Sequence, residues 1–369
     1  MIGAIEYVMR SPVVVLNAAE GGRKLVERKR YTIRDIAKMA KVSHTTVSRV
    51  LNNAPRVREE TRRRLLELVS ILDYRPHARA RAFASKRSHL LGLLVSDISN
   101  PFYAELARGI EDKAHEKGYN VIFCSTDEKS ERMKTYTNLM MDAGVDGLIF
   151  ASVHLHEPVI EKLIDERFPV VLVNRKLSGS SYNYVICNNI QGAYEITEHL
   201  INLGHRKIAI ITGSSNLSTG RERLQGYQKA LKNHGIDFNQ NYVIQGPFKR
   251  ETGYKAAKKL LTMKDGPRAI FAGNDFMAIG VIDAIEELGM NTPEDVAVVG
   301  FDDTEFASHL RTKLTTVSQR KYEMGNLAVQ ILIDYIERKQ KNYIHKVILE
   351  PKLVIRESCG QKLRKNGKR

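Results

Sequence analysis

The chain of 369 residues has ordinary proportions of hydrophobic (43%) and charged (27%) residues, which leaves room for two or three domains with buried cores. Its formal net charge of +16 is concentrated at the ends: residues 30–88 hold 15 Lys and Arg against 5 Asp and Glu, and residues 361–369 add five basic residues. This distribution is typical of a polyanion-binding module beside a near-neutral globular body, and the lack of an apolar run of about 18 residues excludes a membrane span.

Residues 1–30 match no predicted element. Their apolar stretch, residues 11–19, is too short for the core of a signal peptide. The run EGGRK at residues 20–24 can be encoded almost entirely by purines, as a bacterial ribosome-binding site is. We therefore expect residues 1–30 to be a disordered extension or the result of a mis-assigned start, with translation truly beginning just after this run.

Residues 31–53, YTIRDIAKMAKVSHTTVSRVLNN, predict two short helices joined by about three residues. The apolar residues of the first recur with the helical spacing i, i+3, i+4, i+7, at Ile33, Ile36, Ala37 and Ala40. Thr32 stands at the N-cap position, and Asp35 three residues later makes an acidic version of the capping box. Ser43 is expected to cap the second helix.

The second helix is a candidate for contact with DNA. A short turn makes the two helices cross steeply, which lets the second enter a major groove. Its outward residues are hydrogen-bonding types that reach base edges and phosphates: His44, Thr45, Thr46, Ser48 and Arg49. Geometry alone leaves open a helical hairpin with a polar face and no DNA role.

The run T-I-x-D-I-A-x-x-A-x-V-S-x-x-T-V-S-R-V-L-N at residues 32–52 resembles the N-terminal signature of the LacI/GalR family of bacterial transcriptional regulators. The resemblance implies a helix-turn-helix DNA-binding domain over residues 31–75. With the flanking positions of the motif, the predicted DNA-binding set of this domain is Thr32, Ser43, His44, Thr45, Thr46, Ser48, Arg49 and Asn52. Two positions depart from the family pattern: Lys41 replaces the usual glycine of the turn, and Arg58 stands where Ser or Thr would cap a third helix.

That third helix is predicted over residues 56–73. Leu65, Leu68, Val69 and Leu72 are expected to face inward, and Arg62, Arg63 and Arg64 outward. Residues 76–88 then resemble the family's hinge helix, which orders on DNA and lies in the minor groove. Arg81 and Phe83 are its predicted DNA contacts, with Phe83 at the position of the usual leucine wedge. An ordinary linker is the alternative.

From residue 89 the pattern changes to short apolar strands that alternate with amphipathic helices. Strands are predicted at 90–95, 119–125, 145–151, 168–173, 207–212, 269–273 and 296–300, and helices at 102–117, 130–143, 190–203, 219–234, 251–264 and 276–288. Such alternation predicts parallel sheets covered on both faces, and the pattern restarts near Lys207, which favours two lobes with a cleft.

This body resembles the two-lobed periplasmic-binding-protein-like effector domain of the same family, over residues 89–360. The resemblance implies crossovers near Asn188, Ser318 and Ile344, with lobe 1 at about 89–188 and 319–344 and lobe 2 at about 189–318 and 345–360. Residues 361–369 are expected to be a basic disordered tail. The fold class is thus an all-α helix-turn-helix head with a hinge helix, joined to an α/β effector domain with parallel sheets.

Ligands of such sheets sit beyond the carboxyl ends of the strands. Loops there supply Asp97–Tyr103, Asn174 and Arg175, and the segments GRERLQG, GPFKRETG and GFDD. The family resemblance implies effector contacts at Phe102, Tyr103, Asn174, Arg223, Phe248, Asn274, Asp302 and Gln319. A carboxylate, an arginine and amides can clamp hydroxyls, and aromatic faces suit sugar rings or purines.

Several of these residues have a structural alternative. Asn274 could cap the helix at 276–288, and Phe248 could be core packing. Arg221 is expected on the helix surface rather than in the pocket. Arg320 replaces the customary proline after Gln319, so a changed loop would affect that side chain.

Enzyme chemistry finds no support in the motifs. No GxGxxG follows a strand, and neither GxxxxGK[ST] nor GxSxG occurs. His154 and His156 have an alternate spacing that could ligate a metal, but no third ligand accompanies them. We therefore predict no enzymatic activity, no metal and no cofactor. A periplasmic sugar receptor would need an export signal and no basic head, and both requirements fail.

The sequence thus predicts a cytoplasmic transcriptional regulator, a repressor by preference, that binds a pseudo-palindromic operator as a homodimer or tetramer. Its cysteines, Cys124, Cys187 and Cys359, are interpreted as free thiols of a reducing compartment. A small effector in the cleft, whether a sugar, sugar phosphate or nucleobase, is expected to switch DNA affinity. An activator or corepressor-dependent regulator of the same fold is the first alternative, and a sugar receptor without a DNA role the second.

Overall fold

The computed structural model describes residues 31–51, 54–72, 74, 87–179, 181–337 and 344–362, and its contacts divide the chain into two units, residues 1–84 and 85–369. Residues 1–30, the hinge prediction over 76–86 and the tail from 363 lie outside the described residues. Within these ranges no helix combines the length and apolar character needed to cross a membrane.

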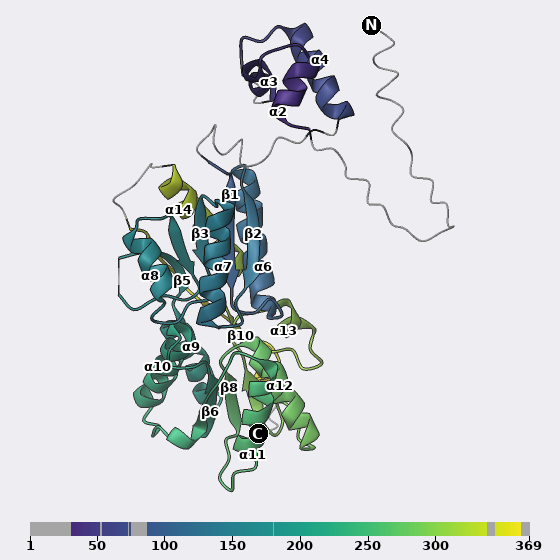
Figure 1. Cartoon of the computed structure of the whole chain (residues 1–369). Helices are drawn as coiled ribbons and strands as arrows, with labels where there is room; N and C mark the ends of the chain where they lie inside the picture. The colour runs from purple at the N-terminus through teal and green to yellow at the C-terminus, as the bar shows by residue number, and fades with distance from the viewer. Residues whose placement is uncertain are drawn as a thin grey trace, which may run out of the picture. The chain divides into compact units, whose positions relative to one another are not determined.

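The head consists of α2 (Ile33–Met39), α3 (His44–Leu51) and α4 (Glu59–Ile71), seen at the purple end of the chain in Figure 1. Its small core joins all three helices through Ile36, Ala37, Ala40, Val47, Val50 and Leu65. The predicted inward residues of the third helix, Leu65, Leu68 and Val69 among them, pack in this cluster. The three-helix prediction is therefore confirmed, although α4 begins three residues later than expected.

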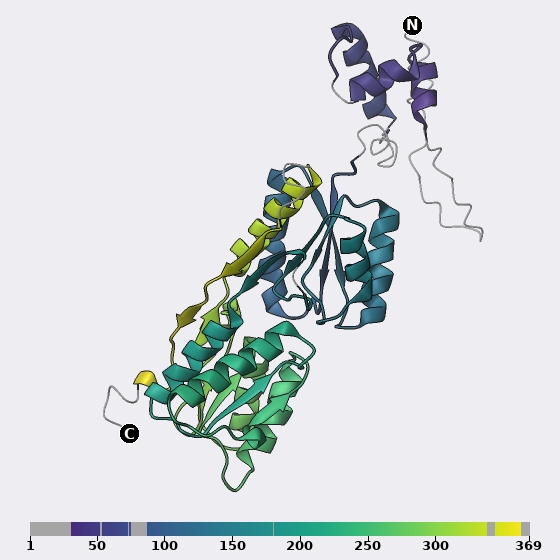
Figure 2. The ribbon, with the colours of Figure 1, turned by 90° about the vertical axis from the view of Figure 1, so that its left-hand side faces the viewer.

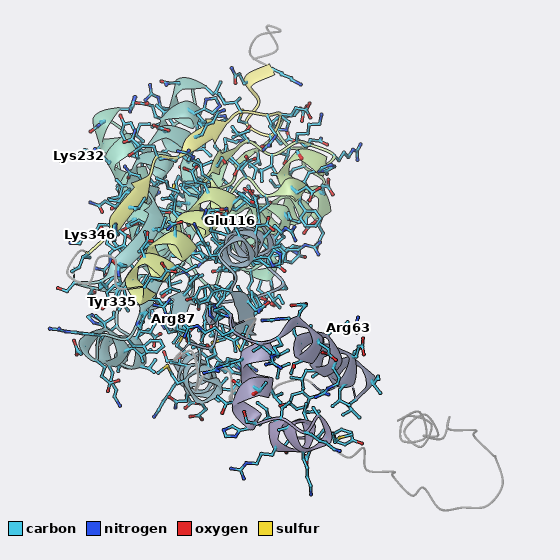
Figure 3. All side chains as sticks on the ribbon, turned by 90° about the horizontal axis from the view of Figure 1, so that it is seen from above. Arg63, Arg87, Glu116, Lys232, Tyr335 and Lys346 are labelled. Atoms are coloured by element: carbon cyan, nitrogen blue, oxygen red, sulfur yellow. The ribbon has the colours of Figure 1, made fainter. Side chains whose placement is uncertain are left out.

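Two of the arginines expected to face outward on α4 fold back onto the head. Arg62 Nη2 donates to Ala54 O at 2.7 Å, and Arg64 Nη2 donates to Ala40 O at 2.8 Å. Arg63, labelled in Figure 3, and Arg64 are both exposed as predicted, with 76% of the Arg63 side chain exposed, whereas Arg62 is half-buried. The carbonyl groups at the ends of helices and turns need donors, and this need overrides the simple inside–outside pattern.

Lobe 1 is built on a six-stranded parallel sheet with the order β11-β5-β4-β3-β1-β2. The strands are β1 (Leu90–Val95), β2 (Asn120–Ser125), β3 (Gly147–Phe150), β4 (Val170–Val173), β5 (Asn183–Cys187) and β11 (Lys346–Leu349). One face packs on α6 (Pro101–Glu116) and α14 (Lys321–Ile336), and the other on α7 (Ser130–Ala143) and α8 (Pro158–Asp165).

Lobe 2 has a four-stranded parallel sheet with the order β7-β6-β8-β9. Its strands are β6 (Ile208–Thr212), β7 (Val243–Gln245), β8 (Ala269–Ala272) and β9 (Ala297–Val299). The helices α9 (Asn189–Asn202) and α10 (Ser218–Asn233) cover one face, and α11 (Arg250–Leu261) and α12 (Asp275–Glu287) the other. A short helix, α13 (Glu305–His309), and the 3-10 turn η1 (Gln240–Tyr242) complete the lobe.

Three chain segments connect the lobes. The first lies between β5 and α9, and the second between β10 (Thr316–Ser318) and α14, both where the sequence placed them. The third was expected near Ile344, but β11 still pairs with β5 in lobe 1, and the chain joins lobe 2 only at β12 (Lys352–Val354), which pairs with β10. Figure 2 shows this yellow segment passing along one side from lobe to lobe. The expected boundary was too early because β11 is only four residues long and was not predicted as a strand.

Candidate functional site

Side-chain caps fix the starts of both α2 and α3, and α3 is the helix that carries the predicted DNA contacts. Thr32 and Asp35 form the predicted capping box of α2: Asp35 N donates to Thr32 Oγ1 at 3.3 Å, and Thr32 N donates to Asp35 Oδ2 at 2.8 Å. Ser43 caps α3, since its Oγ accepts from Thr46 N at 3.1 Å. Both cap predictions are confirmed.

The turn between α2 and α3 is strained at Lys41. Its φ of 53° lies in the left-handed region that glycine adopts without penalty, as the departure from the family pattern indicated. Two hydrogen bonds hold the turn: Val42 N donates to Ala37 O at 3.0 Å, and Arg64 reaches Ala40 O from α4. These hydrogen bonds hold the turn together even without glycine.

The outward face of α3 is polar and accessible. His44, Thr45 and Arg49 are exposed, Thr46 and Ser48 are half-buried, and Val47 and Val50 are buried on the opposite side. The Thr46 hydroxyl lies 2.9 Å from Ser43 Oγ, so it is already engaged at the cap. Thr32 and Ser43 are exposed at the starts of α2 and α3, whereas Asn52, Arg81 and Phe83 lie outside the described residues.

The second candidate site is the cleft of the body. Seven of the eight predicted effector residues line one small cavity: Phe102, Tyr103, Asn174, Arg223, Phe248, Asn274 and Asp302. The eighth, Gln319, lies behind it and donates from Nε2 to Asp302 Oδ1 at 2.5 Å. Arg320 adopts a φ of 55° at the start of α14, and this conformation still leaves Gln319 beside Asp302.

The cavity also has lining residues outside the predicted effector set: Asn100, Arg175 and Thr219. Asn100 and Arg175 belong to loops that the sequence placed at strand ends. Thr219 was missed, because a threonine in the first turn of α10 carries no signal beyond its place after β6. Asn274 both lines the cavity and caps α12, with Oδ1 accepting from Met277 N at 2.9 Å, so its two proposed roles are compatible.

The walls of the cleft meet at several points. Leu155 N in lobe 1 donates to Asn216 O in lobe 2 at 2.8 Å, and Lys176 N donates to Ser218 Oγ at 3.0 Å. The Lys176 ammonium also pairs with Glu222 at 2.8 Å. These contacts hold the lobes together around the cavity.

Arg223 is held in place from several sides. Nε donates to Asn189 Oδ1 at 3.0 Å, Nη1 donates to Gly273 O at 2.5 Å, and Nη2 lies 3.8 Å from Asp302 Oδ1. Its guanidinium carbon lies 5.5 Å from the centre of the Phe248 ring, and that of Arg175 lies 5.7 Å from the same ring. Phe248 therefore contacts both the cleft and the lobe 2 core.

Four polar atoms at the cleft are buried without a hydrogen-bond partner. They are Asn174 Oδ1, Arg175 Nε, Thr219 Oγ1 and Gln319 Oε1. Burying a polar atom without a hydrogen bond destabilises the folded state by about 1–3 kcal/mol. Such atoms usually form a hydrogen bond with water or with a ligand. Two are acceptors, one is a donor and one is a hydroxyl, which together match a ligand that both donates and accepts.

Burial alters the acid–base properties of the cleft. Burial raises the pKa of Asp302 to about 6, although Arg223 and Lys321 favour its charged form. Burial and the nearby Asp302 raise the pKa of Asp275 to about 7. Burial also raises the pKa of the Tyr103 hydroxyl, which accepts from Ser96 Oγ at 2.6 Å.

The two histidines considered as metal ligands have different surroundings. His154 Nδ1 lies 2.5 Å from the buried Glu157, whereas His156 is 78% exposed. In the part of the chain that the structure describes, no three His, Cys, Asp or Glu side chains gather as a metal site would require. Arg221 is exposed on α10, as predicted.

Comparison with known proteins gives the same two-part division. The family profile described as "Bacterial regulatory proteins, lacI family" matches residues 32–77, and that of a "Periplasmic binding protein-like domain" matches residues 197–359. The chain is 36% identical over 329 residues to the HTH-type transcriptional repressor PurR of Photobacterium profundum, covering 89% of this chain and 98% of the relative. It is 38% identical to the catabolite control protein A of Priestia megaterium, covering 84% and 93%.

Solved structures are similar over nearly the whole chain. The lac repressor dimer bound to operator and an anti-inducer has a TM-score of 0.80 at 28% identity, with 90% of this chain and 99% of that chain covered. The complex of the transcriptional regulator CelR with cellobiose has a TM-score of 0.69 at 31% identity, with 89% and 100% covered.

Proposed function

Because this chain belongs to the lacI family of bacterial regulatory proteins, we propose that it is a cytoplasmic repressor that binds a pseudo-palindromic operator as a homodimer and is switched by a neutral sugar. The relatives named above are transcriptional regulators, so the expectation that the chain is not an enzyme is confirmed. We also propose which residues contact the operator half-site and which class of effector binds.

The observation that carries the effector proposal is the set of partnerless buried atoms at the cleft. A sugar hydroxyl donates and accepts at once, so a polyol can satisfy Asn174 Oδ1, Thr219 Oγ1 and Arg175 Nε together. The aromatic faces of Phe102 and Phe248 suit the apolar face of a sugar ring.

The DNA proposal is supported by the exposed polar face of α3. Arg49 is the side chain with the charge and reach to contact both a guanine edge and phosphates. We expect a binding site selected by the chain from random duplexes to be an inverted repeat, since a two-fold dimer presents two copies of α3.

One pair of variants tests the DNA proposal. Arg49→Ala should remove sequence-specific binding, measured by fluorescence anisotropy against a selected and a scrambled duplex. The matched control Arg63→Ala removes the same charge from the exposed face of α4 and should keep sequence preference while lowering the salt dependence at most slightly. Retained preference in Arg49→Ala would refute the assignment of α3.

A second pair tests the effector proposal. A panel of neutral sugars, screened by thermal shift on the full chain, should contain one that stabilises the wild type by several degrees. Asp302→Ala should lose that shift and the sugar's effect on operator binding, while operator affinity itself persists. The control Asp237→Ala changes an exposed carboxylate of lobe 2 and should keep both responses. An unchanged response in Asp302→Ala would remove this residue from the site.

A further inference from the structure

A strained loop at the edge of the cleft places an acidic side chain against it. Asp127 and Glu128 follow β2 with φ of 53° and 57°, a conformation that costs free energy in residues with a Cβ. The surroundings maintain the strain: Thr126 Oγ1 donates to Val95 O at 3.1 Å, and Asp127 N donates to Ser96 O at 2.6 Å. The group that this loop positions is the carboxylate of Glu128.

Glu128 neutralises Arg175, a buried cation of lobe 1 that lines the cavity. Its Oε1 accepts from Arg175 Nη2 at 2.6 Å, and the Arg175 side chain is 3% exposed. A buried guanidinium is a strong ligand for phosphate, which it binds through paired N–H groups. With Glu128 in contact the pair has no net charge, and the partnerless Nε–H of Arg175 remains as a donor to a neutral ligand.

The other cations near the cavity are also matched by carboxylates. Arg223 faces Asp302, and Lys321 pairs with Glu105 at 3.0 Å while its Nζ donates to Asp302 O at 2.6 Å. In the described residues, these two cations and Arg175 thus each have an acidic neighbour, as does Lys176 where the walls of the cleft meet. A phosphate group entering here would lie beside Glu128 and Asp302 without an uncompensated positive charge to receive it.

We propose that Glu128 is a specificity-determining residue, which makes the cleft select uncharged sugars over their phosphate esters by neutralising Arg175. The inference rests on the proposed effector function of the cleft and adds the property by which one effector class is rejected. Glu128 acts on specificity through its contact with Arg175, without touching the ligand itself.

The test measures binding of inorganic phosphate to the full chain by calorimetry and by thermal shift, with phosphate replacing chloride at constant ionic strength. Glu128→Gln keeps an oxygen that can accept from Arg175 Nη2 but removes the charge, and we expect at least tenfold tighter phosphate binding than in the wild type. At about 20 mM phosphate the melting temperature of the variant should then rise by about 2–4 °C. Glu128→Ala also removes the negative charge and has a smaller side chain, so it serves as a second variant.

Two controls make the result specific. Glu131→Gln removes an equal charge from the exposed first turn of α7 and should bind phosphate as the wild type does. In the double variant Glu128→Gln/Arg175→Gln the gain should vanish, because the receiving cation is absent. Equal phosphate affinity in wild type and both Glu128 variants, or an equal gain in Glu131→Gln, would overturn the proposal.

The sugar panel on the wild type separates this inference from the proposed function. If no neutral sugar stabilises the chain, the effector proposal fails, yet the phosphate gain in Glu128→Gln still measures what the carboxylate excludes. If a sugar binds and the Glu128 variants gain nothing for phosphate, the effector proposal stands and the role of Glu128 is refuted.

Discussion

Asp302 is only 3% exposed, and its backbone adopts a φ of 128°. Both the burial of its charge and this backbone conformation cost free energy in the folded state. Burial raises its pKa to about 6 from the ordinary value of 3.8. An acid whose pKa is higher in the folded state binds protons more strongly there. Its contribution therefore favours folding at low pH and is lost as the pH rises from about 4 to above 6.

This predicts a pH-dependent difference between the wild type and Asp302→Asn. The substitution itself changes the free energy of unfolding by an amount that does not depend on pH. Between pH 4.5 and 8 the wild type should in addition lose roughly 1–3 kcal/mol relative to the variant, because only the wild type has the titrating carboxyl group. Urea unfolding of the body at a series of pH values measures the difference. A difference that stays constant over this range would show that Asp302 titrates in the folded state as it does in the unfolded chain.

At the scale of elements, α4 is a helix without a side-chain cap. Arg58 occupies its N-cap position and makes no cap hydrogen bond, while Glu59 and Glu60 follow in the first turn. The backbone N–H groups there lack the acceptor that Ser43 provides for α3. The head is small, so a single cap is a large fraction of its stability.

Arg58→Thr should therefore raise the free energy of unfolding of the head by about 1 kcal/mol. Circular dichroism of the full chain should show the head transition at a higher temperature, with the body transition unchanged. Arg58→Ala, which removes the same charge without adding an oxygen, is the matched control. If both variants have the same effect, the change comes from charge and the cap has no part in it.

The sequence predicts regular elements better than connections. Every boundary of α6, α7, α9, α10 and α12 falls within one residue of expectation, because their apolar spacing repeats over three or four turns. The strands β5, β7, β10, β11 and β12 were not predicted, since each has three to five residues and mixes polar with apolar side chains. Their partners are distant in sequence: β10 pairs with β12 across α14.

The same contrast holds within the cleft. Residues on strand ends and helix starts, such as Phe102 and Asn274, were predicted because the family motif and the sheet topology fix their places. Glu128 was not, because its contact with Arg175 depends on two consecutive left-handed residues in a loop. No sequence pattern for acidic residues predicts such a backbone.

At the scale of the whole molecule, the two units act together only if the cleft and the operator-bound state are thermodynamically coupled. Three connections join the lobes, and the contacts between Leu155 and Asn216 and between Lys176 and Glu222 close the cleft. A ligand that satisfies the buried atoms there stabilises this closed arrangement over an open one. It can change DNA affinity only as far as its own affinity differs between the two states.

Coupling of this kind is reciprocal, which gives the last prediction. If the sugar changes operator affinity 5- to 150-fold, corresponding to about 1–3 kcal/mol, saturating operator must change sugar affinity by the same factor and in the same direction. Calorimetric titration of the sugar into the chain, with and without the selected duplex, measures this factor. In Arg49→Ala the duplex should have no effect on sugar affinity, since the specific complex does not form. Sugar affinity that is identical with and without operator in the wild type would mean that the cleft does not control the head.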